Sequence, residues 1–405
     1  MIKKFLLSSF MLLSLHSFAQ EGTASPYSYY GIGIVKFQGA VENKSMGGLG
    51  ILPDSIHINL QNPASLSALK FTAFNVAGTY NTVKLKNENT AEKARRTTID
   101  YLMMAFPAKK MGISFGLMPY SAVGYKIKKT TEFSTSLYSG NGGVNKVFVG
   151  AGYKIMPKLS IGADFGYNFG KIERMSQVDI GVQNGTGEIN TSEVSGISLN
   201  AGLIYKSKLN KYDFVSSFTL SPSTNLVSKN TSFQSTIPLT SNSGGSKESI
   251  IADSKIKIPS KLAFGAGLGE IKKWFVGFES TFQGSSSFGN KYDPNVSFEN
   301  ATKLSLGGYY IPNFNSFSNY FNKVTYRAGL RYENTGLIVN TKSINDTALT
   351  LGLGLPVGGN VSSVNVGMEY GKRGTKNADL VQENYLNISI GLSFSDRWFV
   401  KRKYN

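Results

Sequence analysis

Residues 160–170, SIGADFGYNFG, alternate strictly between apolar side chains and small or polar ones. A period of two places all the apolar side chains on one face of a β-strand and the others on the opposite face. In a soluble sandwich the apolar face packs against a second sheet, whereas in an outer-membrane barrel it faces lipid and the small polar face lines the lumen. Because residues 386–394 repeat the pattern, the chain is predicted to consist largely of half-buried strands.

The connectors between strands separate these two interpretations. Short connectors such as 107–110, 156–158 and 270–273 alternate with long polar ones such as 121–144 and 223–259. Outer-membrane barrels combine short periplasmic turns with longer external loops around an even number of strands, whereas a soluble sandwich or a repeat adhesin gives no reason for the asymmetry. The predicted fold class is therefore all-β, an antiparallel transmembrane outer-membrane β-barrel of about 14 strands. These strands are expected near 71–81, 98–106, 111–120, 145–155, 159–171, 196–206, 212–222, 260–269, 273–283, 301–311, 323–333, 348–356, 362–371 and 385–394.

The beginning of the chain carries an export signal. MIKK supplies positive charge, FLLSSFMLLSLHSF an apolar run, and FAQ an exit with a small residue, so residues 1–19 are predicted to be a signal peptide cut after Ala19. The alternative is a transmembrane anchor, but the apolar run is shorter than the roughly 18–20 residues that an anchor needs. The predicted location is therefore the outer membrane of a Gram-negative bacterium.

Composition excludes several classes of function. The chain has no cysteine, which rules out disulfides, thiolate catalysis and thiolate metal sites. Its formal charge of +18 is dispersed through polar connectors and the basic tail at 395–405, without a basic helix or an aromatic RNA motif. No nucleic-acid partner is therefore expected, and the charge is interpreted as a solvated surface facing anionic lipid headgroups in the outer membrane.

Aromatic residues recur near the ends of the predicted strands. In a membrane barrel such residues form girdles at the two lipid–water interfaces, although ordinary strand propensity also enriches them. The predicted girdle comprises Tyr101, Tyr120, Tyr153, Trp274, Tyr309, Tyr310, Tyr326, Tyr332 and Tyr370.

Residues 20–70 have neither strand alternation nor a helix-length apolar stripe, and they precede the barrel predicted at 71–394. Pro63 cannot sit inside a central strand because it has no N–H to donate. A barrel of about fourteen strands has a lumen too wide for its own side chains to fill, and irregular backbone is tolerated inside such a lumen. The segment is therefore predicted to be a plug folded into the barrel.

The stretch DSIHINLQNPASLSAL within this segment resembles the N-terminal hatch of the FadL/TodX (OMPP1) family of outer-membrane transporters for hydrophobic compounds. The matching motif residues are Asp54, Ser55, Asn62, Pro63 and Ala64. The resemblance implies fourteen strands, a hydrophobic ligand collected by outer loops, and lateral release through the wall as the hatch rearranges. The stretch MEYGKRGT at 368–375 and the basic ending depart from better-known members, which indicates a divergent branch.

Two functions follow from the sequence. The main hypothesis is passive uptake of small hydrophobic molecules, such as a long-chain fatty acid, with lateral release; the alternative is a FadL-like barrel acting as a docking or shuttle subunit of a protein-secretion machine. No cofactor, metal or catalytic residue is predicted, because the one histidine after the signal peptide, His57, lies in the plug and no G-x-S-x-G stretch occurs. The long connector at 223–259 is interpreted either as a strand extension or as a ligand-collecting surface. The candidate ligand-binding residues there are Leu226, Val227, Phe233, Ile237 and Leu239.

Overall fold

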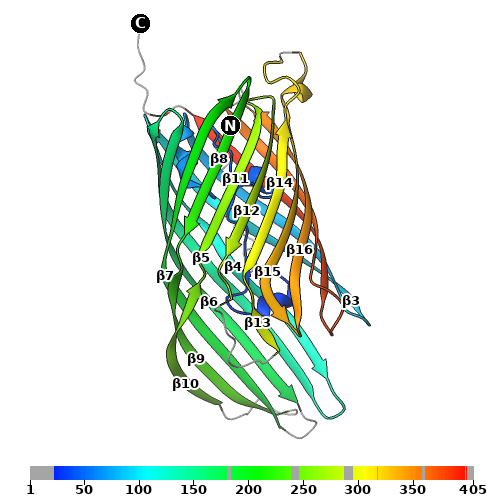
Figure 1. Cartoon of the computed structure of the whole chain (residues 1–405). Helices are drawn as coiled ribbons and strands as arrows, with labels where there is room; N and C mark the ends of the chain where they lie inside the picture. The colour runs from blue at the N-terminus through cyan, green and yellow to red at the C-terminus, as the bar shows by residue number, and fades with distance from the viewer. Residues whose placement is uncertain are drawn as a thin grey trace, which may run out of the picture.

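The computed structural model describes residues 22–179, 184–238, 246–286, 295–316, 318–357, 361–396 and 398. Fourteen antiparallel strands form a tall closed barrel, in which the last strand pairs with the first (Figure 1). The predicted fold class is thus confirmed. The barrel strands are β2 (Thr72–Lys86), β3 (Ala91–Ala108), β4 (Met111–Thr130), β5 (Thr135–Met156), β6 (Leu159–Asp179), β7 (Asn184–Leu209), β8 (Tyr212–Ser221), β11 (Lys261–Glu270), β12 (Trp274–Gln283), β14 (Ala301–Tyr310), β15 (Thr325–Val339), β16 (Lys342–Val357), β17 (Ser362–Arg373) and β18 (Gln382–Asp396).

Several strands run much further than predicted at the end of the barrel that carries the long hairpins. The expected long connector 121–144 is almost entirely strand, because β4 and β5 pair as far as Thr130 and Thr135. The expected connector 223–259 contains a further hairpin of β9 (Thr224–Pro238) and β10 (Ser246–Ile258), with β9 paired to β7. This hairpin lies in the lower part of the molecule in Figure 1, beside the extended ends of β6 and β7. The strand-extension interpretation of 223–259 is therefore correct. A short strand, β13 (Val296–Phe298), pairs with β15.

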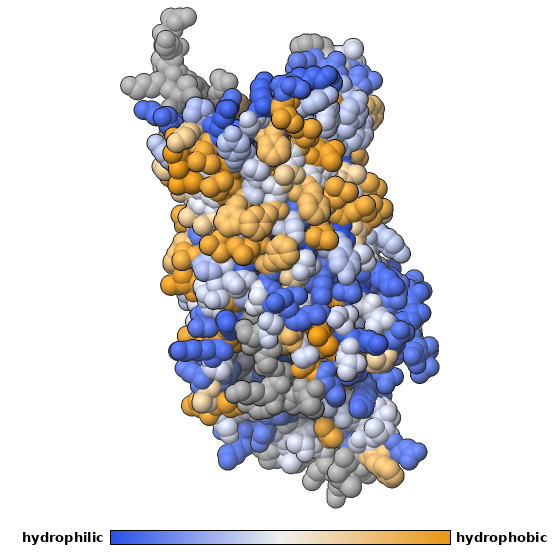
Figure 2. Space-filling view, in the orientation of Figure 1, coloured by the Kyte–Doolittle hydropathy of each residue, from blue (hydrophilic) through white to orange (hydrophobic). Residues whose placement is uncertain are grey.

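An apolar belt surrounds the barrel nearer to the short-turn end. Outward side chains of successive strands are exposed and apolar, including Phe165 on β6, Phe278 on β12 and Leu351 on β16. Figure 2 shows this belt above a largely hydrophilic extension. No helix among the described residues is long and apolar enough to cross a membrane. An outward apolar belt is the surface that a barrel needs in order to sit in a bilayer.

The predicted aromatic girdle is wrong for three of its residues. Tyr101, Tyr120 and Tyr309 pack in or against interior clusters. The hydroxyl of Tyr101 accepts a hydrogen bond there from the backbone N–H of Val41. β3 has a bulge where it pairs with Ala77 and Gly78 of β2, and this bulge determines which β3 side chains face inward. By contrast, Tyr153, Tyr310 and Tyr370 are exposed, as the prediction required.

Residues 22–71, here called the N-terminal segment, precede β2. They contain two 3₁₀ turns, η2 (Pro26–Tyr29) and η3 (Pro63–Ala68), a two-residue strand β1 (Ile34–Val35) and a single helical turn α2 (Val41–Lys44). A further 3₁₀ turn, η4 (Tyr320–Lys323), lies in the connector before β15. The N-terminal segment lies within the barrel, where its blue ribbon is visible between the strands (Figure 1). Its side chains and those of the inward wall positions form the interior of the molecule.

Candidate functional site

The N-terminal segment packs against the wall through three apolar clusters. At the long-hairpin end, Tyr27 of η2 joins Val339 and Leu380. Next to the short turn before β12, Leu49 and Ile51 pack with Phe275. On the opposite part of the wall, Leu66 joins Met103 of β3. These contacts reach strands around the circumference of the barrel.

Inward-facing glycines of the wall allow the segment to approach closely. At Gly329 on β15, a Cβ atom would lie 2.2 Å from the backbone nitrogen of Gly47. At Gly162 on β6, it would lie 2.4 Å from the backbone nitrogen of Ala64. Any larger residue at these two positions would therefore displace the segment. Gly47 itself has a φ of +69°, which glycine adopts without strain.

The Asn-Pro-Ala motif begins the η3 turn and attaches it to the wall. Asn62 is fully buried at the N-cap position, and its Oδ1 accepts the backbone N–H of Ala64 at 3.0 Å. Its Nδ2 donates to the carbonyl of Leu203 on β7 at 3.2 Å. Pro63 stands at the first position of the turn, where its missing N–H costs nothing. Asn62 thus satisfies one group of its own turn and one group of the barrel.

Replacing Asn62 by Ala should loosen the N-terminal segment without unfolding the barrel. The variant loses the bond to Leu203 and the cap of η3, at a cost of about 1–3 kcal/mol for buried polar groups left without partners. We expect flickering current in planar bilayers and an almost unchanged melting temperature. Asn89→Ala, in the exposed turn between β2 and β3, is the matched control. A steady baseline identical to that of the control would contradict this role.

The other motif residues form a clamp between the N-terminal segment and β17. Asp54 Oδ1 accepts the backbone N–H groups of Ser55 and Ile56, while its Oδ2 lies 2.6 Å from His57 Nδ1. His57 Nε2 lies 3.1 Å from Ser363 Oγ on β17. Ser363 Oγ in turn accepts the Nδ2 amide of Asn365 at 3.0 Å. Ser363 is therefore held on both sides, and the arrangement fixes the loop to the wall.

The clamp should depend on pH through His57. Removal from water lowers the pKa of His57, but the carboxylates of Asp54 and Glu42 outweigh this and raise it above its usual value. A raised pKa in the folded protein gives a stabilisation that is complete below about pH 6.5 and is lost as the pH rises through the raised value. We expect His57→Gln to melt lower than the parent protein at pH 6, by an amount that shrinks steadily at higher pH. A gap between the two melting curves that is constant from pH 6 to pH 10 would contradict the clamp.

A buried network of charges lines the lumen on β15 to β18. Arg331 contacts Glu369 at 2.9 Å and Asp346 at 3.4 Å, while Arg373 contacts Asp346 at 2.6 Å and Glu383 at 3.5 Å. The N-terminal segment joins this network, because Lys44 of α2 lies 3.7 Å from Glu369 and the Ser25 hydroxyl donates to Glu383. Removing one partner of such a buried pair typically costs about 3–5 kcal/mol, so the network fixes the segment in one position.

The barrel wall opens between β3 and β4. Their pairing runs from Ala108↔Met111 only as far as Leu102↔Leu117, although both strands continue towards the long-hairpin end. Beyond that point β3 remains paired to β2, and β4 remains paired to β5. The two strands therefore diverge and leave a gap at the level of the outward side chains of Ile99 and Leu102, which are exposed.

The N-terminal segment closes this gap from inside. β1 pairs antiparallel with β4 through Ile34↔Ala122 and Val35↔Ser121. The backbone N–H of Lys36 extends the ladder to the carbonyl of Tyr120 at 2.9 Å. The two residues of β1 and the backbone of Lys36 thus occupy the edge of β4 where pairing with β3 has ended.

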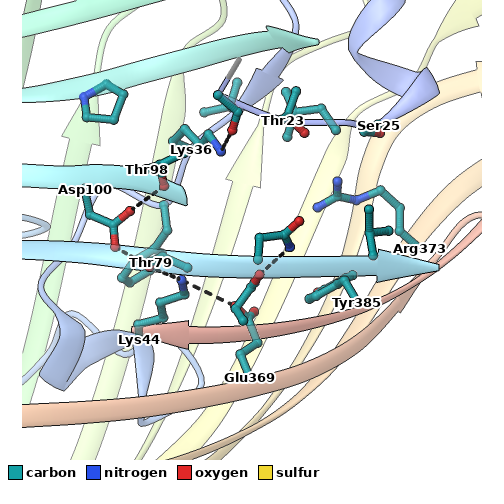
Figure 3. A pocket seen from close by; sticks show the side chains of 18 of the residues that line it. Thr23, Ser25, Lys36, Lys44, Thr79, Thr98, Asp100, Glu369, Arg373 and Tyr385 are labelled. Carbon is teal, nitrogen blue, oxygen red and sulfur yellow. Dashed lines mark hydrogen bonds and ion pairs between the residues drawn. The ribbon is translucent and has the colours of Figure 1, made fainter. Parts of the chain in front are cut away.

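A cavity of about 140 Å³ lies behind the gap. Asp100 and Tyr101 of β3, Pro119 of β4 and residues of β1 line it on the gap side, and the charge network lines it on the other. Figure 3 shows side chains from the N-terminal segment, β3, β17 and β18 around this one space. Asp100 is held there by Thr79 and Thr98, whereas the Lys36 ammonium donates to the carbonyl of Gly22. Charges of both signs therefore surround a small space that adjoins the opening in the wall.

Comparison with known proteins places the chain in a family. A family model described as BamG matches residues 1–405. The chain belongs to the BamG family. No curated protein sequence matches it.

Solved structures share the fold at low sequence identity. The CymD monoaromatic hydrocarbon channel has a TM-score of 0.61 and 15% identity, over 89% of this chain and 98% of that one. The Ralstonia pickettii toluene transporter TbuX has a TM-score of 0.61 and 14% identity, over 89% of this chain and 99% of that one. A Pseudomonas aeruginosa FadL homologue has a TM-score of 0.56 and 11% identity, over 90% of this chain and 99% of that one. The resemblance of this BamG-family chain to a divergent FadL-like barrel is thus confirmed for the fold.

The structure describes three of the candidate ligand-binding side chains of the 223–259 connector. Leu226 is fully buried in an interior cluster with Val123 and Ile258, whereas Val227 and Phe233 are exposed on the other face of β9. Leu239 and the side chain of Ile237 lie outside the described part of the chain. Leu226 packs inside the extension and offers no surface to a ligand, whereas the collecting role of the others stays a prediction.

The wall gap and the cavity behind it were missed by the sequence reasoning, although Pro119 offered a signal. Proline cannot donate to a ladder, so inside a strand it marks an edge or a bulge. Pro119 stands next to the register shift of β4, two residues beyond the last pair with β3. The predicted strand 111–120 includes Pro119 as an ordinary member.

Proposed function

We propose that the protein is an outer-membrane transporter that takes up small hydrophobic molecules and releases them sideways through the gap between β3 and β4. The observation that carries this proposal is the end of β3–β4 pairing at Leu102↔Leu117, with a cavity directly behind it. A hydrophobic molecule that leaves through the wall enters the bilayer directly. It avoids crossing water, where exposure of its apolar surface is unfavourable. The lateral path therefore suits an apolar substrate better than an axial pore does.

The polar side chains that line the cavity favour substrates that carry a polar group. Lys36 and Arg373 offer donors, Asp100 and Glu383 offer acceptors, and Tyr101 and Tyr385 add hydroxyl-bearing rings. An amphipathic molecule, such as a long-chain fatty acid, would place its head among these groups and its tail towards Ile99 and Leu102. The cavity of about 140 Å³ is smaller than the roughly 300–1,000 Å³ of typical ligand sites, so β1 and its neighbours must move during passage.

The sidedness follows from the connectors. Outer-membrane barrels place short turns in the periplasm and long hairpins outside. We therefore assign the turns at 109–110 and 157–158 to the periplasm, and the β9–β10 hairpin to the cell exterior. The gap then faces the outer leaflet, and the clamp of Asp54 and His57 lies near the periplasmic mouth.

Lipid extraction of the purified protein tests this proposal. Protein purified in a detergent with no fatty-acid chain should release a stoichiometric amphipathic molecule detectable by mass spectrometry. Val41→Arg, which adds bulk and charge to a fully enclosed side chain lining the cavity, should release less, whereas Thr82→Arg on the outer face should not differ. An empty parent protein would contradict the proposal.

A second candidate is a docking or shuttle subunit of a protein-secretion machine. The dense pairing of lumenal charges favours it, because Arg331 and Arg373 both bind Asp346, and charged side chains of the wall also bind the N-terminal segment, instead of leaving a roomy apolar path. Native mass spectrometry distinguishes the two functions. A stoichiometric protein partner together with an empty lumen would support docking and exclude transport as the main role.

A further inference from the structure

The divergence of β3 and β4 leaves two strand edges open, from the wall gap towards the long-hairpin end. On its β4 side, β3 pairs with no other described strand over residues 91–101, and β4 pairs with none on its β3 side over 126–130. The N-terminal segment covers the edge of β4 only from Pro119 to Gly124, through β1, Lys36, Gln38 and Ser28. Both open stretches carry backbone donors and acceptors along one side.

Open edges are unusual in this architecture. Closing a sheet into a barrel pairs each strand on both sides and so removes the edges that would otherwise recruit another strand. An edge that stays open in a closed barrel keeps this capacity. On β3 it extends over eleven positions, which is longer than a typical strand of about 5–6 residues.

The molecule itself demonstrates that the edge accepts a strand. β1 adds to β4 in antiparallel register, with Ile34 opposite Ala122 and Val35 opposite Ser121. The same edge continues without a described partner just beyond this addition. A second extended segment could therefore continue the ladder in the direction of Thr130, or pair with β3.

The side chains beside the two open edges are basic. Lys93 and Arg95 on β3, and Lys126, Lys128 and Lys129 on β4, are exposed, and Arg96 is partly exposed. In the open stretch of β3, Glu92 is the acidic residue that faces solvent, while Asp100 is bonded to Thr79 and Thr98. Charge complementarity therefore selects an acidic partner.

We propose that the open edges of β3 and β4 form a docking site for an extended acidic segment of a partner protein, which adds as a strand. Main-chain hydrogen bonds supply the affinity in this mode of recognition, and alternate side chains supply the specificity. The proposal does not rest on transport: the open edge of β3 reaches the wall gap at Ile99, but the basic residues that select the partner, on 93–95 of β3 and 126–129 of β4, lie beyond the residues that β1 covers.

The absence of cysteine allows a direct test by disulfide trapping. The probes are synthetic decapeptides of alternating valine and glutamate, each with a single cysteine at a different position. Thr97→Cys places a thiol on the open stretch of β3. Thr82→Cys on β2, whose two sides are paired with β3 and β18, is the matched control. Circular dichroism and heat-dependent gel migration establish that both variants are folded.

We expect Thr97→Cys to trap the peptides with a period of two along their sequence, and the control to trap them weakly and without a period. N-methylation of alternate amides should weaken binding at least tenfold, and so should Arg95→Glu combined with Lys126→Glu. Trapping that is independent of cysteine position would overturn the proposal. So would equal binding of the N-methylated peptide, or competition by vesicles of lipopolysaccharide that is unaffected by N-methylation, because both would indicate a charge-only site for anionic headgroups.

Discussion

A protein without residues 22–70 should insert as a folded barrel and conduct ions continuously in planar bilayers, where the full chain shows only baseline current. Each barrel strand bonds to neighbouring strands, β3 and β4 to each other only at the short-turn end, and the ladder closes from β18 to β2 without help from the N-terminal segment. The segment fills the lumen through its contacts with Phe275, Met103 and Leu380. Without the segment, the lumen should therefore contain water and form a continuous channel.

The control for this deletion is a double substitution that expels the segment but keeps its residues. Gly162→Val and Gly329→Val place side chains where the backbones of Ala64 and Gly47 now lie. This variant should also conduct. A truncated protein that fails to fold, or that conducts no better than the full chain, would show that residues 22–70 are structural and do not close a pore.

A disulfide between β1 and β4 should abolish uptake reversibly. Val35 of β1 is paired with Ser121 of β4, and Ile34 with Ala122. Opposed Cβ atoms in antiparallel strands lie about 4.5–5.5 Å apart, which is close to the distance that a disulfide needs. Since the chain has no cysteine of its own, Val35→Cys/Ser121→Cys and Ile34→Cys/Ala122→Cys each create one defined bond. We expect uptake of a fluorescent fatty acid by intact cells to fall to background after oxidation and to recover after reduction.

Single-cysteine variants at the same positions are the controls for this lock. Each should transport equally well before and after oxidation, because it has no second thiol in the pair. If either double variant forms its disulfide completely and still takes up the probe at the parental rate, β1 does not gate the path.

The sequence predicted the positions of the fourteen barrel strands because lipid imposes a sharp contrast between their two faces. Residues 160–170 lie within β6, and their apolar members, such as Phe165, face outward. Beyond the membrane the outward face becomes polar, and the apolar side chains there, such as Val123 and Ile172, are few and point inward. The extension was therefore predicted as loop at 121–144, although it is strand.

The candidate site was only partly predictable. Asn62 and Pro63 form a local turn whose chemistry is visible in adjacent residues, and the structure places them against the wall. The charge network joins Lys44 with Arg331, Asp346 and Glu369, whose proximity depends on the register of four strands and on the path of the N-terminal segment. Strand register is not encoded by a period of two alone, so neither this network nor the end of pairing at Leu102 follows from the pattern.

Photocrosslinking of a transported lipid tests the lateral exit most directly. A long-chain fatty acid with a diazirine in its tail would be illuminated with the protein in liposomes, and the labelled peptides identified by mass spectrometry. The account predicts labels concentrated at 97–102 and 117–122, beside the gap, and their loss when β1 is locked to β4. Labels spread evenly around the apolar belt, and unchanged by the lock, would contradict release between β3 and β4.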